Sequence, residues 1–307
     1  MNPKKVGIIR GSNTEYYDAS IKDGAELILN IYNHLDTKWK PVDIFIDKEN
    51  VWHKDGIPLA HSRSTLESID AFWDTTRSDA YLEVGNKKII NVNGGFTSFI
   101  KKDDKQQIEH FKNLGVEVLK HIIISPYLEN IDISIEKYST QKALDVLRKI
   151  SPPWKIKKFP TIKGENQILV KTFPNLIEVI RDFAIKKKSI LIEEYVRGDE
   201  VLFHTLSGFR EKETFIFPYV PADDIGYIRE RNKKEMLESV AKKIHNYLPA
   251  TNYVNTKLIL DSKNQIFLSD FDFCPDFQET SHFTKSCEIV GEHPKNILLY
   301  LLENRVK

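Results

Sequence analysis

Segments of opposite hydrophobic period alternate along the chain, and this predicts α/β or α+β lobes rather than a helix bundle or a β-sandwich. The apolar run Val6–Arg10 is followed by the polar residues Gly11–Thr14, which predicts a short buried strand that ends in a turn. From Ser20 to Leu35 the apolar residues recur at helical spacing. A strand, a polar turn and a helix in this order are typical of a domain that binds a nucleotide or a small substrate.

The same patterns predict the elements of the rest of the chain. Strands are expected at residues 41–46, 88–92, 154–159, 167–171, 189–196, 201–217 and 257–269, and helices at 105–114, 135–150, 175–187, 231–247 and 286–304. Ser151-Pro152-Pro153 ends the helix at 135–150, because proline cannot continue the hydrogen-bond ladder. We expect three parts, residues 1–120, 121–205 and 206–307.

Composition narrows the class of protein. The chain has 45 Lys and Arg against 44 Asp and Glu, a formal net charge of +1 and 41% hydrophobic residues, which disfavours disorder and a nucleic-acid partner. It contains neither an apolar run long enough for a membrane span nor a signal-type segment, so we expect a cytoplasmic protein with no membrane partner. Cys274 and Cys287 are too few for a disulfide scaffold and are expected to be packing residues.

The segment Ile190–Val201 carries the most specific chemistry. An apolar strand ends at Glu193, the backbone continues through Tyr195 and Val196, and a second carboxylate follows at Glu200. Glu193 could accept a hydrogen bond from the amine of an adenine, backbone groups at Tyr195 and Val196 could pair with the ring edge, and Glu200 could accept from both ribose hydroxyls. By chemistry alone, a strand with two solvated acids is the simpler interpretation.

This segment resembles the adenine-binding hinge of the ATP-grasp fold, in particular that of the D-alanine:D-alanine ligases. Other segments resemble motifs of that family in the family's order: Arg10–Gly24 (its first loop), Pro41–Gly56 (its second strand and ribbon), Glu136–Lys142 (a phosphate-binding helix) and Asp270–Ser281 (a metal-binding acid pair and a terminal loop). The resemblance implies an α/β chain with an N-terminal Rossmann-like domain (1–120), a shortened central ATP-grasp subdomain (121–205) and a C-terminal ATP-grasp subdomain (206–307).

The resemblance also implies an activity. ATP would phosphorylate the carboxylate of one D-amino acid, and the amine of a second would attack the acyl phosphate, giving a dipeptide for peptidoglycan precursor synthesis. Position by position, Lys137, Lys157, Glu193, Tyr195, Val196 and Glu200 would bind ATP, Asp270 and Asp272 would bind Mg²⁺, and Glu15, Asn255 and Ser281 would occupy catalytic positions. Glu15 is one residue early in the register set by Ser20 and Gly24. Family members commonly form homodimers through the first domain.

Two substitutions leave two functions open. Lys257 stands where the family has a magnesium-binding aspartate, and an ammonium group cannot bind a metal ion, so one ion is favoured over two. Asn255 stands where the family has an arginine that stabilises the tetrahedral intermediate. One interpretation is an active ligase with altered metal use; the other is a non-catalytic nucleotide-binding or structural relative. We further expect the ammonium of Lys257 to face Asp270 and Asp272 as their counter-charge.

Overall fold

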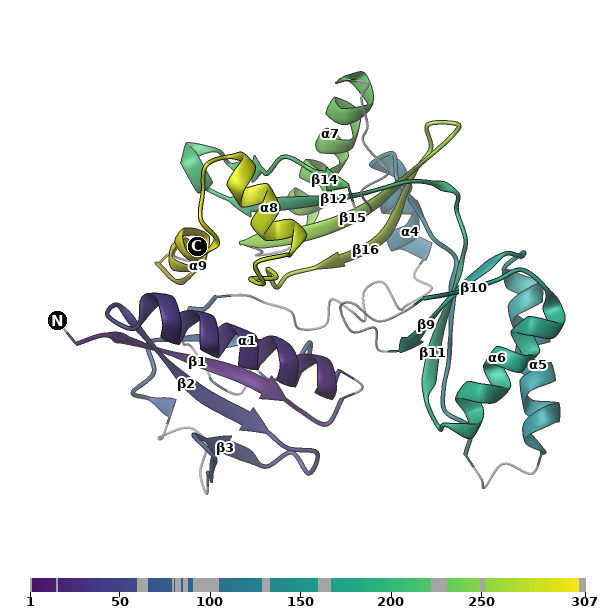
Figure 1. Cartoon of the computed structure of the whole chain (residues 1–307), viewed down its shortest axis with the longest axis horizontal. Helices are drawn as coiled ribbons and strands as arrows, with labels where there is room; N and C mark the ends of the chain where they lie inside the picture. Colours follow the sequence, from purple (N-terminus) through teal and green to yellow (C-terminus); the bar gives the residue numbers. More distant parts are fainter. Residues whose placement is uncertain are drawn as a thin grey trace. The chain divides into compact units, whose positions relative to one another are not determined.

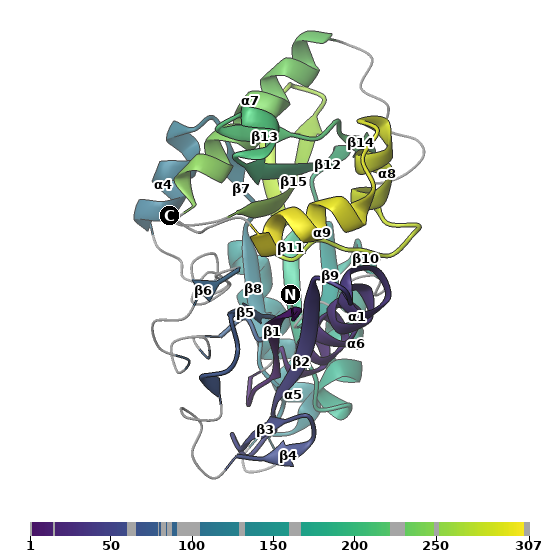
Figure 2. The ribbon, with the colours of Figure 1, turned by 90° about the vertical axis from the view of Figure 1, so that its left-hand side faces the viewer.

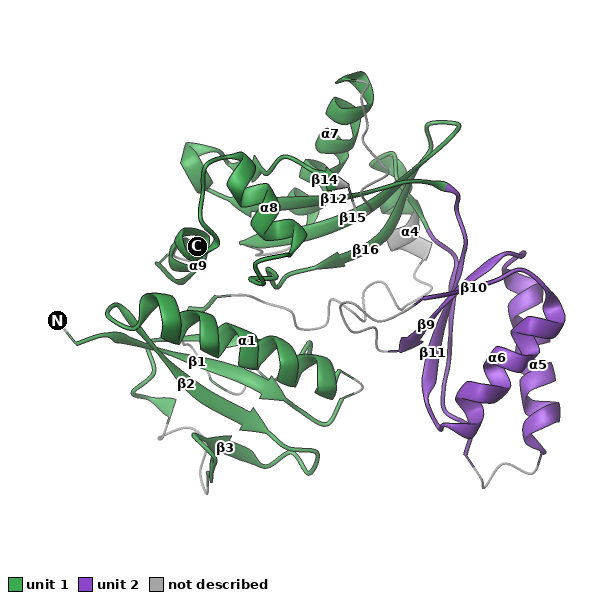
Figure 3. Cartoon of the chain, viewed as in Figure 1, with its two compact units in different colours: residues 1–118, 198–307 green, residues 119–197 purple. Residues whose placement is uncertain are grey.

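The computed structural model describes residues 2–14, 16–59, 66–78, 80, 84, 88–90, 105–128, 133–159, 167–221, 231–248 and 252–303. The chain divides into two compact units, and each is considered by itself (Figures 1 and 3). Unit 1 contains residues 1–118 and 198–307, and unit 2 contains residues 119–197. Within the described ranges, no helix has both the length and the apolar character that crossing a membrane requires.

The N-terminal part of unit 1 is a Rossmann-like sheet with a helix on one face. Its elements are β1 (Lys4–Gly11), α1 (Tyr17–Leu35), β2 (Trp39–Ile46), β3 (Trp52–Lys54), β4 (Ile57–Pro58), β5 (Ala71–Asp74) and β6 (Lys88–Ile89). The strand order is β4-β3-β2-β1-β5-β6; β2, β1, β5 and β6 pair in parallel, and β3 and β4 add an antiparallel ribbon at one edge. Because α1 connects two parallel strands, this is a β-α-β unit, as the opening pattern predicts.

The rest of unit 1 is a mostly antiparallel sheet with helices. Its elements are α4 (Lys105–Asn113), β7 (Glu117–Val118), β12 (Gly198–Ser207), the 3₁₀ turn η2 (Phe209–Glu211), β13 (Thr214–Ile216), β14 (Val220–Pro221), α7 (Arg231–Tyr247), β15 (Tyr253–Asp261), β16 (Ile266–Asp272), α8 (His282–Ile289) and α9 (Pro294–Glu303). The strand order is β13-β12-β15-β16-β7, with β14 paired to β12. The helix α7 lies over one face of this sheet (Figure 2). Its apolar side chains, such as Leu237 and Ile244, belong to the same core as those of β12, β15 and β16.

A second apolar core joins the two sheets of unit 1. It contains Val6 and Ile8 of β1, Leu27 of α1, and Leu206 and Tyr253 of the second sheet. Side chains of α8 and α9, among them Phe283 and Leu298, belong to the same core. The core therefore holds β1 and β5 against the second sheet. The ion pairs of Arg77 with Asp23 and Asp272, described below, also join these two parts of unit 1.

Unit 2 is a four-stranded antiparallel sheet covered on one face by two helices. Its elements are β8 (His121–Ile124), α5 (Ile135–Lys149), β9 (Trp154–Phe159), β10 (Ile168–Val170), α6 (Phe173–Ile185) and β11 (Ser189–Glu194), in the strand order β10-β9-β11-β8. Trp154, Ile156, Ile190 and Ile192 point to the helices and form the core with them. The alternate residues of β9 and β11, including Lys157 and Glu193, therefore point to the opposite face.

The sequence patterns predict most of these elements, with three errors. The predicted helix at 286–304 is two helices, α8 and α9, because Gly291 has a φ of 71° and Pro294 begins the second one. The predicted strand segments at 201–217 and 257–269 are hairpins: a turn at Gly208 joins β12 to β13, and a turn at residues 262–265 joins β15 to β16. The short strands β5, β7, β8 and β14 are missing from the prediction. Cys274 and Cys287 are buried and free, as expected of packing residues.

Candidate functional site

One face of the second sheet of unit 1 carries most of the predicted site residues. In the antiparallel register His204 lies opposite Asn255, and Asn255 lies opposite Asp272. The next row contains Leu202, Lys257 and Asp270. Glu200 is two residues before Leu202 on β12 and so points to the same side. The structure thus brings Glu200, Asn255, Lys257, Asp270 and Asp272 together on one surface, which we call the polar face.

A β-bulge makes this arrangement possible. Leu258 pairs with Leu268, whereas the preceding residue, Lys257, pairs with Asp270, so β16 has one extra residue at Ser269. In a regular strand, residues 268 and 270 would point to the same side. The bulge instead leaves Leu268 in the core under α7 and turns Asp270 to the polar face. Both acids of β16 consequently reach the surface that Lys257 occupies.

The ammonium of Lys257 does not provide the predicted counter-charge to the acid pair. Its Nζ lies 2.5 Å from Oε2 of Glu200, with both side chains about one-fifth exposed. Lys257 pairs in register with Asp270, but the flexible side chain extends along the face to β12. The prediction that Lys257 faces Asp270 and Asp272 is therefore wrong. Lys257 instead forms an ion pair with Glu200, the carboxylate that is predicted to bind the ribose.

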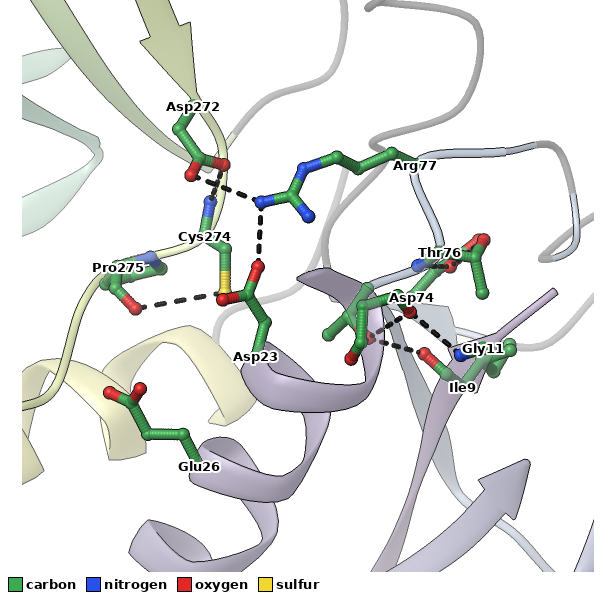
Figure 4. A network of polar contacts seen from close by, with 12 residues as sticks. Ile9, Gly11, Asp23, Glu26, Asp74, Thr76, Arg77, Asp272, Cys274 and Pro275 are labelled. Atoms are coloured by element: carbon green, nitrogen blue, oxygen red, sulfur yellow. Dashed lines mark hydrogen bonds and ion pairs between the residues drawn. The ribbon is translucent and has the colours of Figure 1, made fainter. Parts of the chain in front are cut away.

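The counter-charge of Asp272 is the guanidinium of Arg77, a residue that the sequence analysis did not identify. The guanidinium Nη2 of Arg77 donates to Oδ2 of Asp23 at 2.7 Å and lies 3.5 Å from Oδ2 of Asp272 (Figure 4). Burial lowers the pKa of Arg77, but Asp272 and Asp23 outweigh it and hold the pKa above its ordinary value. The sequence does contain a pattern that could have identified this residue. The apolar run Ala71–Trp73 is followed by polar residues, which indicates the carboxyl end of a buried strand.

Local hydrogen bonds hold the turn that carries Arg77. Oδ1 of Asp74 accepts from the backbone N–H of Thr76 at 2.7 Å and from its hydroxyl at 2.6 Å. Arg77 itself has a φ of 53°, in the left-handed region that residues with a side chain seldom adopt. Strained backbone of this kind is stable only where the surroundings impose it, and it is common at functional sites. The turn lies at the carboxyl end of β5, the usual position of ligands in parallel sheets.

The first loop of the chain is fixed beside this turn. The hydroxyl of Ser20 accepts from the backbone N–H of Gly11 at 2.9 Å and lies 3.1 Å from the hydroxyl of Thr75. Gly11 has a φ of 90°, and a Cβ there would meet the carbonyl oxygen of Ile46, so only glycine fits. Glu15, the candidate amine-binding residue of this loop, lies outside the described residues.

Ser281 has a structural role that the sequence prediction did not include. Its hydroxyl donates to the carbonyl oxygen of Asp276 at 2.7 Å and accepts from the backbone N–H of Thr284 at 3.1 Å. It is therefore the N-cap of α8 and satisfies one of the free N–H groups of the first turn. Its catalytic role stays a prediction.

The two acids of β16 differ in what already contacts their carboxylate oxygens. Oδ1 of Asp272 accepts from the backbone N–H of Cys274 at 3.0 Å, and its Oδ2 faces Arg77. Oδ1 of Asp270 accepts from the backbone N–H of Phe271. Among the residues that the structure describes, no three His, Cys, Asp or Glu side chains form a group suited to a metal ion. Mg²⁺ commonly takes one or two carboxylates plus phosphate oxygens, and Asp270 could supply one such ligand.

Unit 2 contains a second charged pair, on the sheet face away from its helices. Nζ of Lys157 lies 2.7 Å from Oε2 of Glu193, and each residue is only 6% exposed. Tyr195 follows β11 with an exposed side chain, and its backbone N–H donates to the carbonyl oxygen of Pro153 at 3.2 Å. The structure thus joins the predicted strand lysine to the carboxylate proposed for adenine.

Lys137 lies on a different surface of unit 2. The buried side of α5 contains Tyr138, Ala143 and Val146, whereas Lys137 is exposed. Lys137 lines a shallow hollow with outward-facing residues of the same helix, such as Gln141 and Leu144. The helix covers one face of the sheet and the Lys157–Glu193 pair lies on the other, so the structure does not bring Lys137 to that pair.

The comparisons with known proteins show the fold. No family model and no curated protein sequence matches the chain. Among solved structures it is similar to D-alanyl-alanine synthetase A from Vibrio cholerae, with 14% identity, a TM-score of 0.67, and 100% of this chain and 99% of the other covered.

Two further ligases give the same result. For the VanG D-Ala:D-Ser ligase from Enterococcus faecalis, identity is 13% and the TM-score 0.63, with 98% of each chain covered. For the ATP-complexed D-alanine–D-alanine ligase from Bacillus anthracis, identity is 17% and the TM-score 0.62, with 98% of this chain and 96% of the other covered. The chain therefore has the ATP-grasp fold of these ligases over its whole length, as the motif resemblance predicts.

Proposed function

We propose that this protein is an ATP-dependent carboxylate–amine ligase that joins small amino acids through an acyl-phosphate intermediate. The fold supports it, since solved ligases match 98–100% of the chain. The observation that carries the proposal is the polar face, where Glu200, Asn255, Lys257, Asp270 and Asp272 meet on adjacent strands. Polar residues are usual on the solvated face of such a sheet, but here Lys257 and Glu200 are only about one-fifth exposed, so their charges are partly removed from water.

Nucleotide contacts are proposed in each unit separately. In unit 2, Glu193 would accept from the adenine amine, backbone groups at Tyr195 and Val196 would pair with the ring, and Lys157 would contact phosphates; the predicted contact of Lys137 is not carried over, because Lys137 lies on the helix side of the sheet. In unit 1, Glu200 would accept from the ribose hydroxyls. The present partners of Glu193 and Glu200 are Lys157 and Lys257, so nucleotide binding would require both ion pairs to rearrange.

The substrate side is proposed to take two D-amino acids, because the similar solved ligases are named for D-alanine and D-serine. Glu15, Asn255 and Ser281 are the proposed catalytic positions, and Asp270, with Asp272 beside it, the proposed position of one Mg²⁺. The ion would neutralise phosphate charge. We place the reaction in peptidoglycan precursor synthesis in the cytoplasm, with a homodimer as the proposed assembly.

A second function follows from the cations of the polar face. Lys257 stands where the family resemblance places a magnesium-binding aspartate, and Arg77 lies 3.5 Å from Asp272, one of the two proposed metal ligands. A non-catalytic relative that binds ATP without transferring phosphate would retain the nucleotide residues and lose this charge arrangement. The same experiment separates the two functions.

The test is phosphate release from ATP and Mg²⁺ with pairs of D- and L-amino acids, together with mass spectrometry of the product. We expect amino-acid-dependent release and a dipeptide, and a KM for ATP at least tenfold higher in Glu200→Gln. Glu238→Gln is the matched control, because Glu238 forms a lysine pair on the outer surface of α7. ATP binding by calorimetry without any phosphate release would favour the non-catalytic relative. Absence of ATP binding would refute both functions.

A further inference from the structure

Two buried polar atoms beside Asp272 have no hydrogen-bond partner among the described residues. One is Nη1 of Arg77, a donor, and the other is Oδ1 of Asn255, an acceptor. Arg77 reaches Asp272 through its other terminal nitrogen, and Asn255 lies directly opposite Asp272 in the β15–β16 register. Unsatisfied buried donors and acceptors are uncommon in proteins, so a donor and an acceptor that flank the same carboxylate point to a missing polar ligand.

The position of Arg77 suits ligand binding. Its side chain is 13% exposed and is held by two carboxylates, Asp23 on α1 and Asp272 on β16 (Figure 4). The ring of Tyr16 lies 5.9 Å from the guanidinium carbon and closes another side. A guanidinium with five donors in a rigid plane, fixed through one nitrogen, presents the other nitrogen in a defined direction. Nη1 is thus an oriented donor. A mobile arginine at the surface would lose side-chain entropy on binding a ligand, whereas Arg77 is already ordered.

Charge selects the class of ligand. The group around Arg77 joins one guanidinium to two carboxylates, Asp23 and Asp272, and the nearby Lys257 is paired with Glu200. A simple anion would gain a bond to Nη1 but would also come close to the carboxylates of Asp23 and Asp272, which already share this guanidinium. A molecule with both a carboxylate and an ammonium group brings no net charge, and its ammonium group can donate to an acceptor such as Oδ1 of Asn255.

We propose that Arg77 anchors the carboxylate of a small amino-acid substrate through Nη1, while Oδ1 of Asn255 accepts a hydrogen bond from the amino group of the same molecule. This inference deepens the proposed ligase function and rests on it for the identity of the substrate. It assigns substrate binding to a residue of the β5 turn in the N-terminal layer. The carboxylates of Asp23 and Asp272 then act as positioning groups for the guanidinium.

The experiment titrates D-alanine, L-alanine, propionate and ethylamine into the full-length protein, with and without a non-hydrolysable ATP analogue. We expect one of the alanines to bind at least tenfold more tightly than propionate or ethylamine, since each of those lacks one of the two groups. We expect Arg77→Gln to weaken alanine binding at least tenfold and to leave the affinity for the ATP analogue within twofold.

Two further variants separate binding from folding. Arg10→Gln is the matched control, because Arg10 forms a bidentate pair with Asp43 at 2.7 Å on the same sheet. It should bind alanine within twofold of the parent. Asn255→Leu removes the acceptor with little change in volume, and it should weaken alanine binding but not propionate binding. This variant tests the inference even if Arg77→Gln does not fold.

The outcomes separate this inference from the ligase function. If Arg77→Gln and Asn255→Leu bind alanine as the parent does, or if neither alanine binds the parent, the anchor is refuted and an ordered water fills the position. If turnover with ATP continues in Arg77→Gln with an unchanged KM for alanine, the anchor fails and the ligase stands. If alanine binding depends on Arg77 while ATP does not bind, the ligase fails and the anchor stands. Propionate that binds as tightly as alanine would refute the role of Asn255.

Discussion

The ion pair between Lys157 and Glu193 gives the sharpest test of the energetics of unit 2. Both residues are 6% exposed and lie on adjacent central strands, with 2.7 Å between Nζ and Oε2. Removing one partner of a buried pair typically destabilises a protein by about 3–5 kcal/mol, because the remaining charge has lost its counter-charge in a poorly solvated position. We expect about 3 kcal/mol for Glu193→Gln, at the low end, since a buried lysine can lose its proton.

The structure also predicts how the double variant behaves. Lys157→Met with Glu193→Leu removes both charges and leaves apolar side chains of similar volume. Replacement of a whole buried pair in this way is often neutral or stabilising. We therefore expect the double variant to be within about 1 kcal/mol of the parent, while its ATP binding is lost. This would show that the pair serves ligand binding rather than stability.

Amide hydrogen exchange of peptides from β9 and β11 is the appropriate assay, because it reports the opening free energy of unit 2 without contributions from unit 1. A loss of about 3 kcal/mol corresponds to exchange roughly a hundredfold faster. Asp145→Asn is the control in the same unit: Asp145 pairs with Arg148 on α5, with side chains 44% and 75% exposed, and should change stability by less than about 1 kcal/mol. If Glu193→Gln accelerates exchange no more than Asp145→Asn, the pair is hydrated and the reasoning is refuted.

Three further predictions concern unit 1. Burial lowers the pKa of His245 to about 4, below its unfolded value near 6.5. The stability that neutral His245 provides is therefore present above pH 6.5 and is lost as the pH falls towards 4. His245→Gln should flatten this part of a plot of unfolding free energy against pH. In urea unfolding, Gly11→Ala should destabilise the chain by more than about 2 kcal/mol and Gly56→Ala by only about 1 kcal/mol. Both glycines have a positive φ, but only a Cβ at Gly11 would meet the backbone of a neighbouring strand. Equal losses for the two variants would contradict this reasoning. Burial raises the pKa of Cys287 to about 12, so its thiol should resist iodoacetamide at pH 8 until the chain unfolds, as mass spectrometry would show; rapid native labelling would contradict its burial.

The sequence by itself determined the elements whose period and end signals are local. The helix predicted at 135–150 is α5, which ends before Pro152 as expected, and the strands predicted at 154–159 and 189–196 are β9 and β11. These features depend on residues within a few positions of one another. The motif resemblance correctly gave the fold, and it selected acids and amides that do share one face of β12, β15 and β16.

The tertiary structure alone decided which charges meet. Alternation along β16 would place residues 268, 270 and 272 on one side, but the bulge at Ser269 leaves Leu268 in the core and turns Asp270 away from it. Arg77 and Asp272 are 195 positions apart, and their contact exists because one apolar core joins the two sheets of unit 1. Lys257 could reach Asp270 or Glu200 from its strand and selects Glu200. Contacts between flexible side chains from distant segments depend on packing in three dimensions, which the period of a single strand does not encode.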